Sequence, residues 1–120
     1  MKILIAEDNE KNRKLIQVIL EKAGYDAIEA ENGEDAICLA KKIIPDLILM
    51  DIQMPVMDGI EAIKILKSDS ETKDIPVIAL TSYAMAGDRE RLLNEGFNGY
   101  IPKPINVKNF IKEVKKYIKP

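Results

Sequence analysis

Three short apolar runs in the sequence each end at a side chain that carries oxygen. They are Ile3-Leu4-Ile5-Ala6 before Glu7-Asp8, Leu47-Ile48-Leu49-Met50 before Asp51, and Val77-Ile78-Ala79-Leu80 before Thr81. Runs this short and this uniformly apolar are typical of strands buried on both faces of a parallel sheet. Because the carboxyl ends of parallel strands meet at one edge of the sheet, we expect these oxygen-bearing side chains to form one site.

The acidic residues of this set would repel one another if the first and third strands are neighbours. Two carboxylates ~4 Å apart repel by about 4 kcal/mol at an effective dielectric constant of ~20, so Glu7, Asp8 and Asp51 would need a cation. Hard oxygen ligands select Mg²⁺ or a similar divalent ion, which keeps coordination positions that phosphate oxygens can enter. Lys103 adds a fixed positive charge and Thr81 a hydroxyl donor. Together these groups predict a cradle in which one carboxylate attacks a phosphoryl group.

Strand and helix patterns alternate five times along the chain, which predicts an α/β fold with a parallel sheet and helices on both of its faces. The expected strands cover about residues 3–6, 25–30, 47–50, 76–81 and 99–102. The expected helices cover about residues 10–23, 34–43, 60–67, 84–95 and 107–118. In this arrangement the acidic and hydroxyl side chains lie at the ends of three strands.

The expected helices differ in the strength of their signals. Residues 10–23 have Asn9 as a cap, Gly24 as a left-handed stop, and one apolar face. That face carries Leu15, Ile16, Ile19, Leu20 and Ala23, and the last helix has a similar stripe of Val107, Phe110, Ile111, Val114 and Ile118.

The helix over 84–95 has the weakest pattern. Gly87 lies in its interior, where glycine costs ~1 kcal/mol relative to alanine, and its only large apolar anchors are Met85, Leu92 and Leu93. We therefore expect this helix to be among the softer parts of the fold.

Length and charge restrict the classes of protein to consider. With 120 residues and a formal net charge of -2, the chain is expected to form one domain and not to bind DNA directly. No apolar stretch approaches the ~20 residues of a membrane helix, and we expect no signal peptide before the first strand. Cys38 is expected to pack as a small apolar residue in a reducing, cytoplasmic environment. The absence of histidine excludes a histidine phosphodonor.

The ordered set of motifs resembles the receiver domain of two-component response regulators. It comprises Glu7-Asp8, Asp51, Met54-Pro55, Asp58-Gly59, Thr81 and Lys103-Pro104, and it extends over nearly the whole chain. The resemblance implies a CheY-like, flavodoxin-like (βα)5 fold with a five-stranded parallel sheet in the order 2-1-3-4-5 and five helices on both faces. It also implies a single receiver domain over residues 1–120 without an output domain, and a cis bond between Lys103 and Pro104.

The same resemblance assigns roles to the acidic residues. Asp51 would accept a phosphoryl group from a phosphohistidine of a sensor histidine kinase or a histidine phosphotransfer protein. Asp8 and Asp51 would bind Mg²⁺ (or Mn²⁺) directly, Gln53 through its backbone carbonyl, and Glu7 through water.

The remaining roles concern the phosphoryl oxygens and the response to them. By the resemblance, Thr81 and Lys103 would hold the phosphoryl oxygens. Tyr100 would be the switch aromatic, which turns inward as Thr81 moves toward the phosphate. Gln53 and Tyr83 occupy positions that vary in the family and tune the access of water to the phosphoryl group.

These residues predict a signalling switch rather than an enzyme with multiple turnover, because the protein would catalyse only its own phosphorylation and dephosphorylation. The aspartyl phosphate would bias the fourth helix, the fifth strand and the last helix toward a second arrangement. With no output domain, the signal would leave by contact with a downstream target protein or by onward transfer of the phosphoryl group. A relay intermediate and an end-point are both compatible with the sequence.

Two other functions fit less well. An aspartyl phosphatase of the haloacid dehalogenase type has a second Asp two residues after the nucleophile, where this chain has Gln53. A flavin carrier of similar topology needs a phosphate loop rich in Ser, Thr and Gly after the first strand, where Glu7-Asp8 would repel a phosphate. The lysines of the last helix are more typical of a solvated face than of a nucleic-acid surface.

Overall fold

The central strand of the sheet, β3 (Leu47–Asp51), is buried along its whole length, as its apolar sequence predicts. The computed structural model describes residues 1–82 and 87–118. Its strands are β1 (Lys2–Ala6), β2 (Asp26–Ala30), β3, β4 (Val77–Thr81) and β5 (Gly99–Pro102). They pair in parallel in the order β2-β1-β3-β4-β5, which confirms the predicted fold and strand order.

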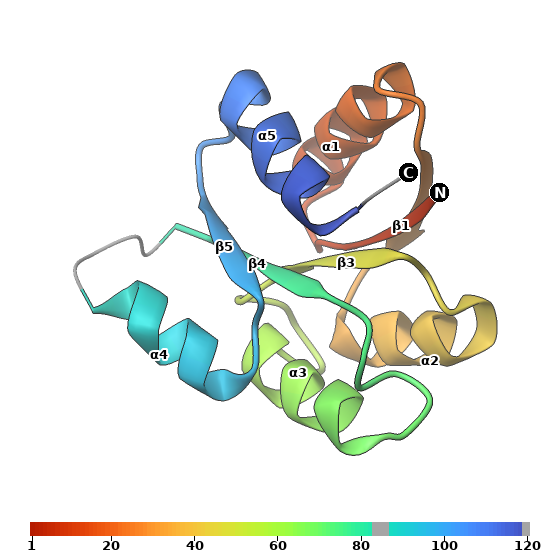
Figure 1. Cartoon of the computed structure of the whole chain (residues 1–120), viewed down its shortest axis with the longest axis vertical. Coiled ribbons are helices and arrows are strands. Elements are labelled where there is room, and N and C mark those ends of the chain that lie inside the picture. Colours follow the sequence, from red (N-terminus) through yellow and green to blue (C-terminus); the bar gives the residue numbers. More distant parts are fainter. Residues whose placement is uncertain (83–86, 119–120) are drawn as a thin grey trace.

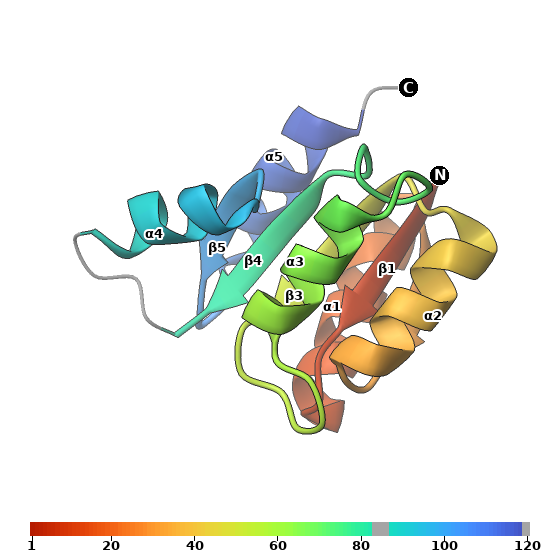
Figure 2. The ribbon, with the colours of Figure 1, turned by 90° about the horizontal axis from the view of Figure 1, so that it is seen from below.

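Helices cover both faces of this sheet (Figure 1; Figure 2). They are α1 (Glu10–Lys22), α2 (Gly33–Ile43), α3 (Gly59–Ser68), α4 (Asp88–Glu95) and α5 (Val107–Tyr117). Because successive strand residues point to opposite faces, Ile3 and Ile5 pack with α1 and α5, whereas Leu4 and Ala6 pack with α2 and α3. None of the helices in the described part of the chain combines the length and apolar character needed to span a bilayer.

Asparagine and aspartate side chains fix where four helices begin. At α1, the predicted cap Asn9 accepts a hydrogen bond from the Asn12 backbone N–H at 3.0 Å. Asn32, Asp58 and Asn106 do the same for α2, α3 and α5. Each cap satisfies an N–H group that the helix itself cannot pair, so these helices start at defined residues beside the strand ends.

The predicted buried face of α1 is partly wrong. Leu15 is 49% exposed and Ala23 is exposed beyond the helix, whereas Arg13 is buried with Ile16. The apolar stripe of α1 is wider than the strip that contacts the sheet, and Leu15 lies outside that strip. Arg13 can face inward because its guanidinium binds backbone carbonyl groups of the β1–α1 loop and lies near Glu29.

The sequence pattern predicts Gly87 in the interior of the fourth helix, and this prediction is wrong. Gly87 is the residue before the helix and has a φ of +95°, a left-handed conformation that glycine adopts without steric cost. The beginning of the expected helix and its anchor Met85 lie outside the described residues, as does Tyr83. In α4, Leu92 is buried as predicted, but the other predicted anchor, Leu93, is 39% exposed because it lies on another side of the helix, so the apolar contact is thinner than the sequence suggests.

Two further predictions about burial are wrong. Cys38 is exposed, because α2 turns Ala36, Ile37 and Ala40 toward the sheet and leaves Cys38 on its solvent side. Val107, the first residue of α5, is 54% exposed, since the buried contacts of that helix come from Phe110 and Val114.

The loop after β3 returns so closely to the strand that only glycine fits at the start of α3. A Cβ added to Gly59 would lie against the carbonyl oxygen of Asp51 and 2.9 Å from the Cα of Ile52. The Gly59 N–H donates to the Ile52 carbonyl at 2.9 Å, which fixes this approach. Gly59 therefore helps to determine where the end of β3 lies.

We predict that Gly59→Ala lowers the free energy of unfolding by about 2 kcal/mol, because the added methyl group overpacks the β3–α3 junction. Helix propensity alone predicts the opposite sign, a gain of up to ~1 kcal/mol. Urea unfolding followed by circular dichroism measures the change. A variant at least as stable as the wild type would contradict the steric account.

Candidate functional site

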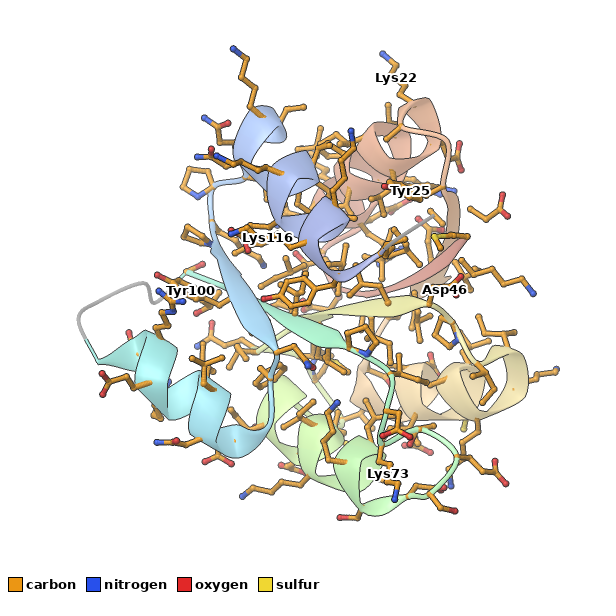
Figure 3. All side chains as sticks on the ribbon, in the orientation of Figure 1. Lys22, Tyr25, Asp46, Lys73, Tyr100 and Lys116 are labelled. Carbon is orange, nitrogen blue, oxygen red and sulfur yellow. The ribbon has the colours of Figure 1, made fainter. Side chains whose placement is uncertain are left out.

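The predicted site residues, with the exception of Tyr100, meet in one pocket at the carboxyl edge of the sheet. Its lining includes Glu7, Asp8, Asp51, Gln53, Thr81 and Lys103. They come from the ends of β1, β3 and β4 and from the segment that follows β5, and the strands run side by side toward this edge (Figure 2). By contrast, Asp46 lies at the other end of β3, where it accepts a hydrogen bond from the Lys2 N–H (Figure 3).

Three carboxylates converge in the pocket, as the sequence predicts. Glu7, Asp8 and Asp51 each offer one oxygen atom, and these atoms lie within 4.8 Å of one another. Glu7 and Asp51 are buried, whereas Asp8 is exposed. Mutual repulsion at such distances amounts to several kcal/mol unless a positive charge lies nearby.

Lys103, in the segment after β5, supplies that positive charge. Its Nζ donates to Glu7 Oε1 at 2.9 Å and to Asp51 Oδ2 at 2.8 Å. Burial lowers the pKa of Lys103, but the hydrogen bonds to Asp51 and Glu7 outweigh this effect and raise it overall. The backbone N–H of Lys103 also donates to the Thr81 carbonyl at 2.8 Å, and the Lys103–Pro104 bond is cis, as predicted.

The surroundings of Glu7 change the pKa of its carboxyl group. Burial and a hydrogen bond with Asp51 raise its pKa from 4.5 to about 7, although Lys103 opposes the shift. Its second oxygen, Oε2, is buried without a hydrogen-bond partner among the described residues. An unpaired carboxylate oxygen beside two further carboxylates fits a hard divalent cation, bound directly or through water.

Both oxygens of Asp51 have partners that fix its orientation. Oδ1 accepts a hydrogen bond from the Gln53 backbone N–H at 3.1 Å, and Oδ2 accepts from Lys103. The strand end is held by the Ile52 N–H, which donates to the Leu80 carbonyl at 3.1 Å. Asp51 is thus an oriented carboxylate beside the ammonium group of Lys103. This arrangement suits a nucleophile that attacks an anionic group, because the ammonium group offsets the negative charge of that group.

The hydroxyl and aromatic residues lie at different distances from the acids. Thr81 is buried at the end of β4 and lines the pocket. Tyr100 is half-buried on the edge strand β5, pairs in register with Ala79, and does not line the pocket (Figure 3). Its side chain packs against the core that α2 and α3 share with the sheet.

The sequence pattern does not predict four polar residues around the pocket. Asn9, Asn12 and Ser82 line it, and Arg13 lies buried behind Glu7. Ser82 has no distinctive spacing in the sequence, whereas Asn12 ends the polar run over residues 7–12 that follows the first strand. Arg13 had a detectable signal, since it stands three residues before Ile16 and seven before Leu20, at a position that the helix turns inward.

Comparisons with known proteins agree with this geometry. The response regulator receiver domain family matches residues 3–115. Two curated relatives are the polar-differentiation response regulators DivK of Brucella anthropi, 49% identical, and of Brucella ovis, 48% identical. Each comparison extends over 116 residues and covers 97% of this chain and 94% of the relative.

Solved structures show the same fold. The chemotaxis protein CheY4 of Vibrio cholerae has a TM-score of 0.90 at 29% identity, covering 98% of both chains. The receiver domain of a sensor histidine kinase from Pseudomonas aeruginosa has a TM-score of 0.89 at 34% identity, covering 97% of this chain and 95% of that one. That domain was solved with a magnesium ion coordinated in its active site cleft.

The family match and the relatives both extend over nearly the whole chain, and the acidic pocket lies where strand ends meet. The protein therefore belongs to the response regulator receiver domains, the phosphorylation-dependent signalling switches of two-component systems.

Proposed function

We propose that Asp51 is the residue that receives the phosphoryl group. The observation that carries this proposal is the pair of hydrogen bonds on its carboxylate, from Gln53 N–H to Oδ1 and from Lys103 Nζ to Oδ2. They hold the buried carboxylate in the wall of a pocket that also contains the ammonium group of Lys103. An anionic phosphoryl group entering the pocket would approach an oriented oxygen nucleophile and an ammonium group together.

The pocket residues support a divalent cation as the cofactor, and we assign it to Mg²⁺ (or Mn²⁺). Asp8 and Asp51 would be direct ligands, Gln53 would contribute its backbone carbonyl, and Glu7 would act through water. The unpaired Glu7 Oε2 and the excess of three carboxylates over one ammonium support this donor set. When bound, the cation would neutralise phosphoryl oxygens during transfer.

In the transfer step, a carboxylate oxygen of Asp51 attacks the phosphorus atom of a phosphohistidine. The new P–O bond forms as the P–N bond breaks, and the imidazole of the donor leaves and takes up a proton. Lys103 and Thr81 hold the phosphoryl oxygens, and the product on Asp51 is an acyl phosphate. The donor is a sensor histidine kinase or a histidine phosphotransfer protein, and hydrolysis of the acyl phosphate resets the switch.

The response travels from Thr81 to the edge of the sheet. Thr81 and Tyr100 are on neighbouring strands, and Lys103 N–H donates to the Thr81 carbonyl, so β4 and β5 are directly connected at the pocket. Movement of Thr81 toward the phosphoryl group would let Tyr100 turn inward and shift α4, whose single buried residue in the described part is Leu92. A downstream protein reads this change, or a phosphotransfer protein removes the phosphoryl group.

We predict that acetyl phosphate with Mg²⁺ adds one phosphoryl group to the protein and that Asp51→Asn abolishes the adduct, because the amide cannot act as the nucleophile. Intact-protein mass spectrometry measures the product. Asp46→Asn is the matched control, since Asp46 lies at the far end of the same strand. An adduct that survives Asp51→Asn, or forms equally well in EDTA, would overturn the assignment.

We predict that the metal-free protein loses stability as the pH rises through about 7. The folded state raises the pKa of Glu7 from 4.5 to about 7, so between these values it binds a proton that the unfolded chain releases. The corresponding stability, about 3 kcal/mol, is fully present below pH 4.5, falls as the pH rises from 4.5 to about 7, and is lost above the folded pKa.

Glu7→Gln should therefore flatten the dependence of stability on pH and unfold at a higher temperature than the wild type at pH 8 in EDTA. Thermal unfolding between pH 5 and pH 8 measures the effect. The exposed Glu61, changed to Gln, is the control and should leave the wild-type profile intact. A wild-type profile in the Glu7→Gln protein would show that Glu7 does not titrate as described.

A further inference from the structure

Arg13 places a guanidinium in the interior of the protein, which requires a specific reason because a buried charge needs polar partners. The residue is 7% exposed and is the fourth residue of α1, one turn after the β1–α1 loop. That loop carries Glu7 and Asp8. The proposed phosphorylation mechanism gives Arg13 no role.

Three successive carbonyl groups of the loop accept hydrogen bonds from Arg13. Its Nη1 donates to the Glu7 carbonyl at 2.9 Å and, more weakly, to the Asp8 carbonyl at 3.5 Å. Its backbone N–H donates to the Asn9 carbonyl at 2.9 Å. One residue therefore determines the orientation of the peptide groups on both sides of Asp8.

The other side of the guanidinium faces β2. Nε lies 3.6 Å from Glu29 Oε1, and Nη2 lies 3.9 Å from Glu31 Oε1. The Glu7 N–H donates to the Ala30 carbonyl at 3.1 Å, so the same loop is also bound to β2 through its backbone. Arg13 thus connects the loop, α1 and β2. The guanidinium can do so because its N–H donors lie on three nitrogen atoms, whereas the donors of a lysine side chain all lie on one.

We propose that Arg13 is a positioning residue for the acidic pocket. By binding the carbonyls of Glu7 and Asp8 it keeps their side chains in the arrangement that binds a divalent cation. This inference rests on the proposed metal-dependent function of the pocket. It differs from a purely structural role, in which Arg13 would only stabilise the contact between α1 and β2 through Glu29.

Lys14 offers a matched control for this distinction. It follows Arg13 on the same helix and also pairs with Glu29, with Nζ 3.4 Å from Oε2, but no hydrogen bond connects it to the loop carbonyls among the described contacts. Arg13→Met removes the guanidinium and keeps an unbranched side chain, and Lys14→Met removes the neighbouring charge alone. Arg13→Lys keeps the charge and serves if Arg13→Met does not fold.

The experiment measures two quantities on each purified full-length variant. Isothermal titration calorimetry gives the dissociation constant for Mg²⁺, and NMR hydrogen exchange of the metal-free protein gives the opening of the Glu7 amide. We expect Arg13→Met to weaken Mg²⁺ binding by about 10-fold or more and to speed exchange of the Glu7 amide several-fold. Arg13→Lys should fall between Arg13→Met and the wild type, and Lys14→Met should match the wild type in both measurements.

Unchanged Mg²⁺ affinity in a folded Arg13→Met or Arg13→Lys protein would overturn the proposal, as would equal effects of Lys14→Met. If the wild type binds no Mg²⁺, the proposed metal-dependent function fails. The positioning claim is then decided by the amide of Glu7, whose exchange must still respond to Arg13 and not to Lys14.

Discussion

Repulsion among the carboxylates of Glu7, Asp8 and Asp51 is the constraint on which the rest of the structure depends. Their oxygen atoms lie within 4.8 Å, and two of the three residues are buried. Within the described chain, the nearest compensating charge is Lys103, which reaches Glu7 and Asp51 from beyond the edge strand β5. Such a cluster opposes folding, and the fold must hold it together by interactions made elsewhere.

The buried strands provide that support. Every residue of β3 and β4 is buried, and the two apolar cores on either side of the sheet fix the positions of the strand ends. Close backbone contacts then orient the loops, including Gly59 against the end of β3 and Arg13 against the β1–α1 loop. A rigid apolar layer thus carries a polar edge in which charges remain available for a divalent cation and a phosphoryl group.

The sequence pattern predicts the parts of this fold that depend on local physics. Short apolar runs locate β1, β3 and β4, and Asn9 predicts the start of α1 because a cap acts within a few residues. Contacts between remote residues are different, since the approach of Lys103 to Asp51 depends on strand order. Apolar periodicity does not determine the strand order, which only the resemblance to receiver domains predicts.

The wrong predictions share a physical origin. Arg13 stands at an inward position of the helical period, but a charged residue is normally expected at the surface, and the carbonyl groups that it binds are not visible in a side-chain pattern. Periodicity also predicts an apolar stripe without saying which part touches the sheet, and Leu15 therefore lies outside the contact. The pattern also places Gly87 in a helix interior, although its left-handed φ belongs to the turn before α4.

The central claim is that the acids at the carboxyl edge of the sheet form one cation site around Asp51. Titration of the isotope-labelled protein with Mg²⁺, followed by NMR of the backbone amides, tests it most directly. The account predicts saturable shifts that concentrate at Glu7, Asp8, Asp51, Gln53 and Lys103 and that disappear in Asp51→Asn. Shifts that do not saturate, or that concentrate on another surface of the protein, would contradict it.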